Sequence, residues 1–282
     1  MQVITTVSEL RAWRKALYQQ GKQVGFVPTM GNLHEGHLQL VKAASAECDV
    51  VIASIFVNPM QFGQNEDLDA YPRTIEADKT KLIAQGVDVL FLPAVDEMYP
   101  RGLNRQTFVE VPGLSDIICG VTRPGHFRGV ATVVSKLFNM VVPDQAFFGE
   151  KDFQQLQVIQ TMVKDLSMDV VICPVATERE ADGLAMSSRN GYLNEKERKI
   201  APFVFQTLKN IRAAVQAGQS NYRLVEKEAQ QALDVEGFKT DYVTIRESET
   251  LREAQSGDTD LVVLIAAYLR TTRLIDNLRF KI

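Results

Sequence analysis

The chain has 282 residues, of which 45% are hydrophobic and 23% are charged, and these are the proportions of an ordinary globular protein of roughly two domains. The formal net charge is −4, which argues against a broad basic surface for nucleic acid or for an anionic membrane. The longest apolar run, residues 261–269, is too short to cross a membrane as a helix.

The beginning of the chain predicts a packed helix rather than a secretion signal. Thr6 and Glu9 have the spacing of a capping box, and Leu10, Trp13 and Leu17 recur at helical intervals. We therefore expect Trp13 in the core. Because no signal-peptide core is present and the three cysteines have no metal-binding or redox spacing, the sequence predicts a cytoplasmic protein.

Between residues 23 and 175, short apolar runs alternate with helical patterns. This alternation predicts an α/β fold, a Rossmann-like parallel sheet with helices on both faces. In such sheets ligands bind at the carboxyl ends of the strands, near the point where the strand order reverses, so residues that directly follow strands are candidates for a site. The expected strands are 24–27, 50–57, 87–92, 146–148 and 170–175, and the expected helices are 38–46, 74–85, 130–140 and 153–166.

The segment PTMGNLHEGH, residues 28–37, connects the first of these strands to the first of these helices. His34 and His37 stand about one helical turn apart and project to one side. Backbone N–H groups and the helix dipole favour a phosphate at such a helix start, and Gly36 leaves room for a flat group such as adenine. A single histidine here would be a cap or a surface residue, but the pair around a glycine predicts a nucleotide site. It is not a P-loop, because the Lys and Ser/Thr that must follow Gly36 are absent.

Further polar residues follow the second strand and flank the next helix start. Asn58 and Gln61 would stand at the exit of that strand, beside the histidines, although a proline turn with solvated amides has the same sequence. Arg73 and Asp78 flank the start of the helix at 74–85. Asp78 would either interact with the helix dipole or hold a metal ion, and the sequence leaves both interpretations open.

Two later segments that contain glycine also precede helices, and the second of them repeats the strand–glycine–helix layout of residues 28–37. RPGHFRG, residues 123–129, precedes the helix expected from residue 130 and contains Arg123 and His126. These side chains suit a carboxylate or a phosphate, although a solvated loop would look the same. In FGEKDFQQ, residues 148–155, Lys151 opposes the dipole of the helix that it begins, which is unfavourable unless an anion binds there.

From about residue 177 the pattern changes and predicts a second, smaller α+β domain. Its helices are expected at 195–217 and 222–233, and its strands at 242–246, 260–268 and 273–278. The domain opens with DGLAMSSRN, residues 182–190, which we expect to form a mobile surface loop. Ser187, Ser188 and Arg189 in this segment can surround phosphate oxygens, although many loops contain such a string.

Taken together, these motifs resemble the bacterial pantothenate synthetase (pantoate–β-alanine ligase) family. The family is related to class I aminoacyl-tRNA synthetases and other nucleotidylyltransferases, whose His-Ile-Gly-His and Lys-Met-Ser-Lys-Ser signatures are similar to residues 34–37 and 186–189 here. The leading lysine of the second signature is absent, and Arg189 takes the place of the later one. The segments that carry the resemblance are 28–37, 56–61, 123–127, 149–155, 183–190 and 274–277.

The resemblance implies a two-step reaction. Pantoate attacks the α-phosphate of Mg-ATP to give pantoyl adenylate and pyrophosphate, and β-alanine then displaces AMP to give pantothenate. It also implies a homodimer in which residues 1–176 bind ATP and pantoate and residues 177–282 act as a lid. The residues expected to stabilise the charge on the phosphates are His34, His37, Lys151, Ser187, Ser188 and Arg189, with His37 also as a general acid.

The resemblance further implies which residues bind each substrate. Neutral amides at Gln61 and Gln155 can hold pantoate without neutralising its nucleophilic carboxylate. Mg²⁺ is expected with ATP, its ligands unassigned. The expected substrate-binding residues are Asn58, Gln61, Arg123, His126 and Gln155. The expected ATP-binding residues are Met30, Gly31, Asn32, Leu33, His34, Glu35, Gly36, His37, Gly149, Glu150, Lys151, Asp152, Met186, Ser187, Ser188 and Arg189.

Two other classes of protein are compatible with the nucleotide motifs alone. An adenylyltransferase that acts on a phosphorylated acceptor would need cations in place of Gln61 and Gln155. A nucleotide-sensing module would bind ATP without any reaction. A tRNA synthetase is disfavoured, because the chain is short and acidic and has no recognisable anticodon-binding region.

Overall fold

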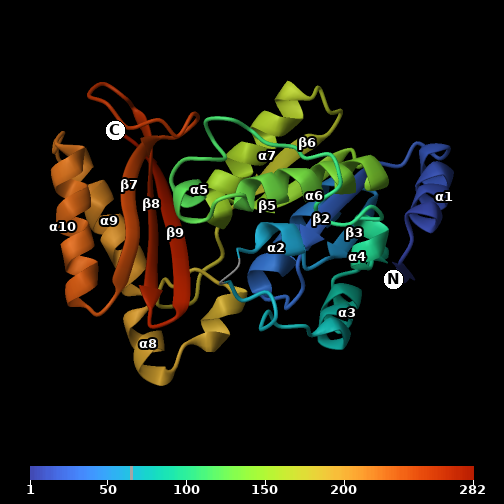
Figure 1. The fold of residues 1–282 in the computed structure, drawn as a ribbon, viewed down its shortest axis with the longest axis horizontal. Coiled ribbons are helices and arrows are strands. Elements are labelled where there is room, and N and C mark those ends of the chain that lie inside the picture. Colours follow the sequence, from blue (N-terminus) through green and yellow to red (C-terminus); the bar gives the residue numbers. More distant parts are fainter. Residues whose placement is uncertain (64–65) are drawn as a thin grey trace. The chain divides into compact units, whose positions relative to one another are not determined.

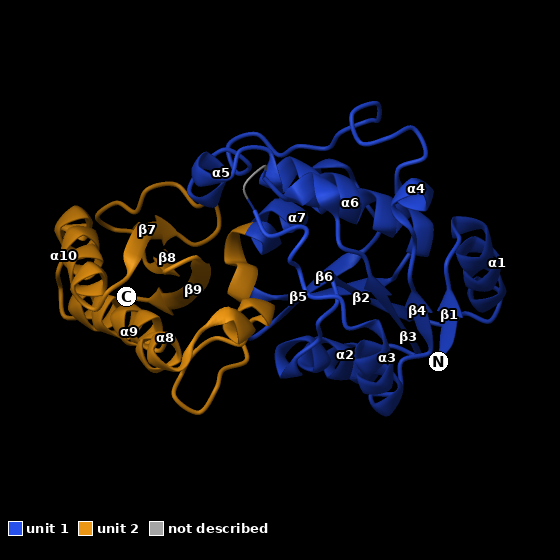
Figure 2. Cartoon of the chain, turned by 60° about the horizontal axis from the view of Figure 1, so that its bottom comes forward, with its two compact units in different colours: residues 1–150, 155–176 blue, residues 151–154, 177–282 orange. Residues whose placement is uncertain are grey.

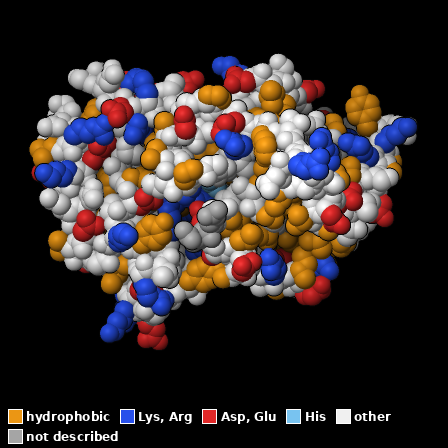
Figure 3. Space-filling view, in the orientation of Figure 1, with side chains coloured by type: hydrophobic (Ala, Val, Ile, Leu, Met, Phe, Trp, Pro, Cys, Tyr) orange, Lys and Arg blue, Asp and Glu red, His pale blue; other side chains and the backbone are white. Residues whose placement is uncertain are grey.

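The computed structural model describes residues 1–63 and 66–282. The chain divides into two compact units, shown in different colours in Figure 2. Unit 1 contains residues 1–150 and 155–176, and unit 2 contains residues 151–154 and 177–282. Within the described ranges, no helix has the length and apolar character that a membrane span requires. On the face displayed in Figure 3, basic and acidic side chains are interspersed.

Unit 1 is built on a six-stranded parallel sheet (Figure 1). This confirms the predicted Rossmann-like architecture. The sequence pattern does not reveal the edge strand β1, because three residues are too few to show a periodicity. From one edge to the other, the strands are β1 (Gln2–Ile4), β4 (Val89–Phe91), β3 (Val50–Ile55), β2 (Val24–Thr29), β5 (Gln145–Gly149) and β6 (Val171–Val175).

Helices lie in the connections between these strands, and residues 151–154 of η2 and α7 belong to unit 2. Two short 3-10 helices, η1 (Pro59–Gln61) and η2 (Glu150–Asp152), follow β3 and β5. The α-helices are α1 (Val7–Tyr18), α2 (Glu35–Glu47), α3 (Ile75–Ala84), α4 (Val95–Met98), α5 (Cys119–Thr122), α6 (His126–Val141) and α7 (Phe153–Asp165).

Both faces of the sheet are covered, α2 and α3 on one side and α6 and α7 on the other (Figure 2). Val27 and Phe147 belong to the core beneath α2 and α3. Phe26 and Phe148 lie on the opposite face, where both contact the ring of Phe138 in α6 edge to face. Neighbouring residues of one strand are therefore buried on opposite faces, which explains the continuous apolar runs. Burying each such phenylalanine contributes about 1.5–3 kcal/mol.

Helix α1 begins and buries Leu10 as predicted, but its other buried side chain is not the predicted one. The hydroxyl of Thr6 accepts the N–H of Glu9. The prediction that Trp13 lies in the core is wrong, because Trp13 is partly exposed and Arg14 is buried. Arg14 pairs with Asp144 at 3.2 Å, and a buried charge of this kind requires such a partner.

The helix expected from residue 130 begins earlier, at His126. Gly125 precedes it with φ of +82°, a left-handed conformation that suits glycine. Gly129 therefore lies inside α6, where a Cβ atom would stand 2.4 Å from the carbonyl oxygen of Met60. The glycines that suggested a loop allow α6 to start here and to approach η1 closely.

Unit 2 combines an antiparallel sheet with helices packed on it (Figure 1). Leu208 of α9, Leu233 of α10 and Ile265 of β8 belong to their shared core. The single helix predicted over 195–217 is wrong, because Pro202 separates two helices. The elements are α8 (Glu195–Ile200), α9 (Phe203–Gln216), α10 (Tyr222–Val235), β7 (Lys239–Glu247), β8 (Asp260–Leu269) and β9 (Thr272–Lys281), with strand order β7–β8–β9.

Candidate active site

The chain turns sharply between β2 and α2. Gly31 and Asn32 have φ of +82° and +51°, a region that glycine and asparagine adopt more readily than other residues. The hydroxyl of Thr29 donates to the carbonyl oxygen of Ser54 at 2.8 Å and accepts the N–H of Gly31 at 3.2 Å. This turn places the start of α2 at the carboxyl edge of the sheet.

Asp78, in the first turn of α3, anchors this turn. It is 1% exposed, and its two oxygens accept the backbone N–H groups of Leu33 at 2.8 Å and of Asn32 at 2.9 Å. The hydroxyl of Thr74 donates to the same carboxylate at 3.1 Å. Among the residues that the structure describes, no group of three or more His, Cys, Asp or Glu side chains is arranged to hold a metal ion. The sequence left open a helix-dipole role and a metal-binding role for Asp78. Neither is needed to explain this residue, because its carboxylate binds the backbone of residues 28–37, which we call the histidine motif.

The two histidines lie together at the start of α2. Their ring centroids are 4.1 Å apart, and the backbone N–H of His34 lies 3.3 Å from Nδ1 of His37. Because Nδ1 accepts this bond, the proton of the neutral His37 ring is assigned to Nε2, from which it can be donated to a ligand oxygen. Glu35 follows His34 in the sequence, and its carboxylate pairs with the ammonium group of Lys42 at 2.6 Å.

The strand order of the sheet reverses between β2 and β5. These strands are neighbours, with Phe26 paired to Ala146, while β3 lies beyond β2 and β6 beyond β5. Ligands of parallel α/β sheets bind at such a reversal. The histidine motif follows β2, and Gly149 ends β5. A Cβ atom at Gly149 would meet no other atom within 4 Å, so open space adjoins the backbone there.

Asn58 and Gln61 lie beside the histidine motif but differ in environment. Asn58 is 1% exposed; its amide nitrogen donates to the side-chain oxygen of Gln61 and to the carbonyl oxygen of Gly129, both at 3.1 Å. Its own oxygen accepts the hydroxyl of Tyr99 at 2.7 Å, and burial raises the pKa of this phenol. The amide nitrogen of Gln61 lies 2.9 Å from the sulfur of Met30. Asn58 therefore orients Gln61, which is the more accessible of the two amides.

Arg123 and His126 form a network with Glu66. Arg123 donates two hydrogen bonds to the carboxylate of Glu66, at 2.6 and 2.5 Å, and its Nη1 lies 3.0 Å from Nε2 of His126. Nδ1 of His126 lies 2.8 Å from the carbonyl oxygen of Gln61, so the network holds the backbone at Gln61. Burial acts to raise the pKa of Glu66, but the hydrogen bonds and charge of Arg123 outweigh it and hold that pKa below its ordinary value.

Lys151 lies in η2, the 3-10 turn that precedes α7. Its Nζ is 4.0 Å from a carboxylate oxygen of Asp152, and its carbonyl oxygen accepts the side-chain amide of Asn277 in β9 at 2.9 Å. Lys151 and Asp152 belong to unit 2, whereas Gln155, in the first turn of α7, belongs to unit 1 and is partly exposed.

Ser187, Ser188 and Arg189 directly follow a small hairpin of unit 2, residues 178–186. The hairpin is closed by a β-bridge between Arg179 and Ala185. The expected surface loop is wrong for the centre of 182–190, because Leu184 and Ala185 are each only 4% exposed. At η3 (Ser188–Tyr192), the hydroxyl of Ser187 accepts the N–H of Arg189 at 3.2 Å. The structure thus brings the two hydroxyls and the arginine together at one helix start.

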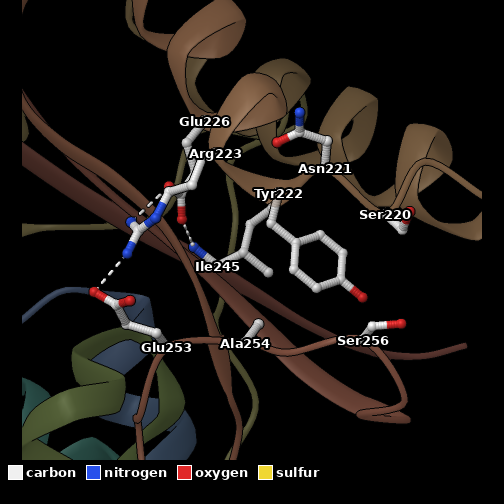
Figure 4. Close-up of a pocket in the computed structure, with 9 residues that line it drawn as sticks. All are labelled: Ser220, Asn221, Tyr222, Arg223, Glu226, Ile245, Glu253, Ala254 and Ser256. Atoms are coloured by element: carbon white, nitrogen blue, oxygen red, sulfur yellow. Dashed lines mark hydrogen bonds and ion pairs between the residues drawn. The ribbon is translucent and has the colours of Figure 1, made fainter.

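A separate hollow of about 190 Å³ lies at the start of α10 (Figure 4). Arg223 there pairs with Glu226 at 3.0 Å and with Glu253 at 2.5 Å. None of the predicted site residues lines this hollow, and its one arginine is already paired with both of its glutamates. It is not the candidate site.

Sequence analysis did not find the residues that hold the site in place. Tyr99, Glu66 and Arg179 belong to none of the motifs and act on residues distant in the chain. Asn277 lies in the segment 274–277, which carries part of the family resemblance. The sequence alone therefore marks this residue but assigns it no role. Asp78 was noticed for its position in a first turn, without its partners.

The family model described as pantoate-beta-alanine ligase matches residues 2–279. The chain is 58% identical to the pantothenate synthetase of Alteromonas mediterranea over 279 residues, 99% of each chain. The crystal structure of pantothenate synthetase from Thermus thermophilus has a TM-score of 0.91 at 45% identity and covers 99% of both chains. That of the ligase from Francisella tularensis, complexed with beta-gamma ATP and beta-alanine, has a TM-score of 0.82 at 34% identity, over 99% of this chain and 97% of the other.

These matches extend over essentially the whole chain rather than over the nucleotide motifs alone. They decide against the two other classes that those motifs left open. The chain belongs to the pantoate–β-alanine ligase family and catalyses the ATP-dependent ligation of pantoate with β-alanine.

Proposed function

We propose that ligation proceeds in two steps at the carboxyl edge of the unit 1 sheet. In the first step a carboxylate oxygen of pantoate attacks the α-phosphorus of ATP, and pyrophosphate leaves with the electrons of the broken P–O bond. In the second step the amine of β-alanine attacks the acyl carbon of pantoyl adenylate and loses a proton, and AMP leaves. The observation that carries this proposal is the adjacent pair of imidazoles at the start of α2, beside the strand reversal.

The phosphates are assigned to donors at the starts of α2 and η3 and in η2. Negative charge grows on the α-phosphate and on the departing pyrophosphate, and preorganised donors lower the barrier by stabilising it. His37 is the better candidate for the general acid, because its Nδ1 accepts the backbone N–H of His34, which leaves the proton of the neutral ring on Nε2 for donation to a ligand oxygen. The residues assigned to this role are His34, His37, Lys151, Ser187, Ser188 and Arg189.

The remainder of the nucleotide is assigned to the turns that follow β2 and β5. Glu35 contributes through its backbone, because its carboxylate is paired with Lys42. Gly149 adjoins open space, where the ribose can lie. The other residues assigned to ATP are Met30, Gly31, Asn32, Leu33, Gly36, Glu150, Asp152 and Met186.

Pantoate is assigned to the amides of Gln61 and Gln155. A neutral amide can bind the carboxylate and the hydroxyls without removing the negative charge that the nucleophile needs. Asn58 serves pantoate through Gln61, whose side chain it orients. Arg123 and His126 act on the same residue through its carbonyl oxygen. Substitution of Gln61 should therefore weaken the binding of pantoate before that of ATP.

Mg²⁺ is proposed to enter with ATP, bound mainly to phosphate oxygens and water, so that EDTA should abolish adenylate formation. We assign to residues 177–282 the role of a lid that excludes water from the hydrolysable acyl adenylate. The family resemblance also leads us to propose a cytoplasmic homodimer. Analytical ultracentrifugation at micromolar concentration tests the dimer, which a single species near the monomer mass of 31.5 kDa would contradict.

Exchange of labelled pyrophosphate into ATP tests the first step. Exchange should require pantoate and should not occur with phosphorylated acceptors. Addition of β-alanine should then give AMP and pantothenate in equal amounts. Binding of ATP without pantoate-dependent exchange would contradict the two-step route.

A further inference from the structure

Two consecutive residues of β9, Asp276 and Asn277, reach both of the unit 2 segments to which phosphate contacts are assigned. Adjacent side chains of a strand point to opposite faces of the sheet, so these two can act on different parts of the unit. Both residues are buried, at 5% and 7% exposure. Neither has a role in the reaction as described above.

Asn277 holds the peptide that carries Lys151. Its side-chain amide donates to the carbonyl oxygen of Lys151 at 2.9 Å, across 126 residues of sequence. A hydrogen bond from a buried side chain to a backbone carbonyl restrains the backbone itself. The bond therefore sets where the long Lys151 side chain starts, and from there its ammonium group must reach a phosphate.

Asp276 holds the base of the hairpin 178–186 through Arg179. The guanidinium makes two bonds to the carboxylate, at 2.6 and 2.9 Å, across 97 residues. Arg179 also donates to the carbonyl oxygen of Gly183 at 3.1 Å, and its guanidinium carbon lies 3.7 Å from the ring centroid of Phe205. Arg179 also donates to the carbonyl oxygen of Asn277 at 3.5 Å, so four partners fix it. The hairpin that it fixes leads directly into Ser187 and Arg189.

We call Asn277, which holds Lys151, the first anchor and Asp276, which holds Arg179, the second anchor. The two anchors are also connected to each other. One carboxylate oxygen of Asp276 accepts the backbone N–H of Asn277 at 2.8 Å. A buried ion pair contributes little net stability, because desolvation offsets the attraction. Its paired, planar hydrogen bonds do fix one geometry. This favours a role in placement over a role in stability.

We propose that Asp276 and Asn277 are positioning residues for adenylate formation. Asn277 sets the position of Lys151, and Asp276, through Arg179, sets the position of Ser187 and Arg189. This inference rests on the proposed phosphate contacts of Lys151 and Arg189. Because a misplacement of about 1 Å at a catalytic group costs on the order of 10²-fold in rate, loosening either anchor should slow the first step.

A double-mutant cycle with Asn277→Ala and Lys151→Ala tests the first anchor in pantoate-dependent pyrophosphate exchange. Asn277→Ala should lower the exchange rate by about 10- to 100-fold. In the Lys151→Ala background the same change should cost less than about twofold, because the ammonium group that it positions is gone. Asn277→Leu, which keeps a similar volume, replaces Asn277→Ala in the cycle if the latter does not fold.

The second anchor is tested by Asp276→Asn combined with Arg189→Ala in the same way. Its matched control is Asp241→Asn, since Asp241 also accepts two bonds from a partly buried arginine of unit 2, Arg273, at 3.1 and 2.7 Å. No role in the reaction is assigned to that pair. Asp241→Asn should leave the exchange rate within about twofold of that of the unsubstituted enzyme. It should change the free energy of unfolding to an extent comparable to Asp276→Asn.

The possible results separate the inference from the assignments on which it rests. Strong loss in the single anchor variants, absent in the Lys151→Ala and Arg189→Ala backgrounds, supports it. Full, additive losses in those backgrounds overturn it, as does a normal rate in Asn277→Ala and Asp276→Asn when Lys151→Ala and Arg189→Ala are slow. If Lys151→Ala and Arg189→Ala themselves exchange normally, the proposed phosphate contacts are wrong and the inference falls with them.

Discussion

Replacing Asp78 by asparagine should loosen the histidine motif while leaving its chemical groups unchanged. Asp78 is not expected to touch either substrate. Its two oxygens hold the backbone N–H groups of Leu33 and Asn32, at 2.8 and 2.9 Å, immediately before His34. Asparagine preserves the shape of the side chain but presents an NH₂ group to one of these two donors.

The expected loss of stability follows from these two bonds. One buried N–H group loses its acceptor, which costs about 1–3 kcal/mol. The other keeps a neutral acceptor in place of a charged one, and the difference is roughly 1 kcal/mol. Asp78→Asn should therefore lower the free energy of unfolding by about 2–4 kcal/mol. If the turn shifts by about 1 Å, adenylate formation should fall on the order of 10²-fold.

Urea denaturation measures the first quantity, and pantoate-dependent pyrophosphate exchange under conditions where the variant is folded measures the second. Asp144→Asn is the control, because Asp144 accepts the N–H of Val24 at 2.7 Å, at the opposite end of β2 from the histidines. It should lose stability but exchange normally. The reasoning is refuted if Asp78→Asn is destabilised yet exchanges at the normal rate, or if Asp144→Asn is equally slow.

Three further expectations concern the assigned side chains and one residue that supports them, Glu66. His37→Ala and Lys151→Ala should each lower pyrophosphate exchange by about 10²-fold or more with little change in the thermal midpoint, and a rate near that of the unsubstituted enzyme would contradict the assignment. Gln61→Ala should raise KM for pantoate with little change for ATP, so an unchanged pantoate KM would remove Gln61 from the binding site. The pKa of Glu66 is lowered from 4.5 in the folded chain, so the unfolded chain binds the proton first as the pH falls. The stability that its pairing with Arg123 contributes should therefore be complete above pH 4.5 and lost below it, and Glu66→Gln should flatten this part of the stability–pH profile measured by denaturation.

The centre of the sheet was predictable because β2, β3, β4 and β5 consist mostly of buried residues. In β3, all six residues are buried, and a short, nearly continuous apolar run of this kind favours a strand covered on both faces. The order of the strands was not predictable, because pairing of β2 with β5 joins residues more than a hundred positions apart. Before the structure was known, the turns at Gly31 and Gly149 were connected only by the rule that ligands bind where the strand order reverses. The structure shows that these turns follow neighbouring strands, β2 and β5.

The errors in the sequence analysis have both local and tertiary causes. Gly125, with its left-handed backbone, and Pro202, between α8 and α9, act locally. Gly129 allows α6 to contact η1. Trp13 fits the apolar stripe of α1, but Arg14 is the side chain that has a partner in the interior. For Gly129 and Arg14, the residue's neighbour in space, rather than its neighbours in sequence, decides the outcome.

The residues that carry chemistry and those that place them are distributed differently. Groups that bind one small ligand come from short loops, so they form local motifs that a sequence displays. The anchors reach those motifs from far away: Asp78 acts on Asn32 across 46 residues, Tyr99 on Asn58 across 41, and Asn277 on Lys151 across 126. Their residue types are ordinary and gain meaning only from the fold. Since rate depends on placement within about 1 Å, substitutions at the anchors test the proposed mechanism as severely as substitutions at the histidines, and they do so without removing a single reacting group.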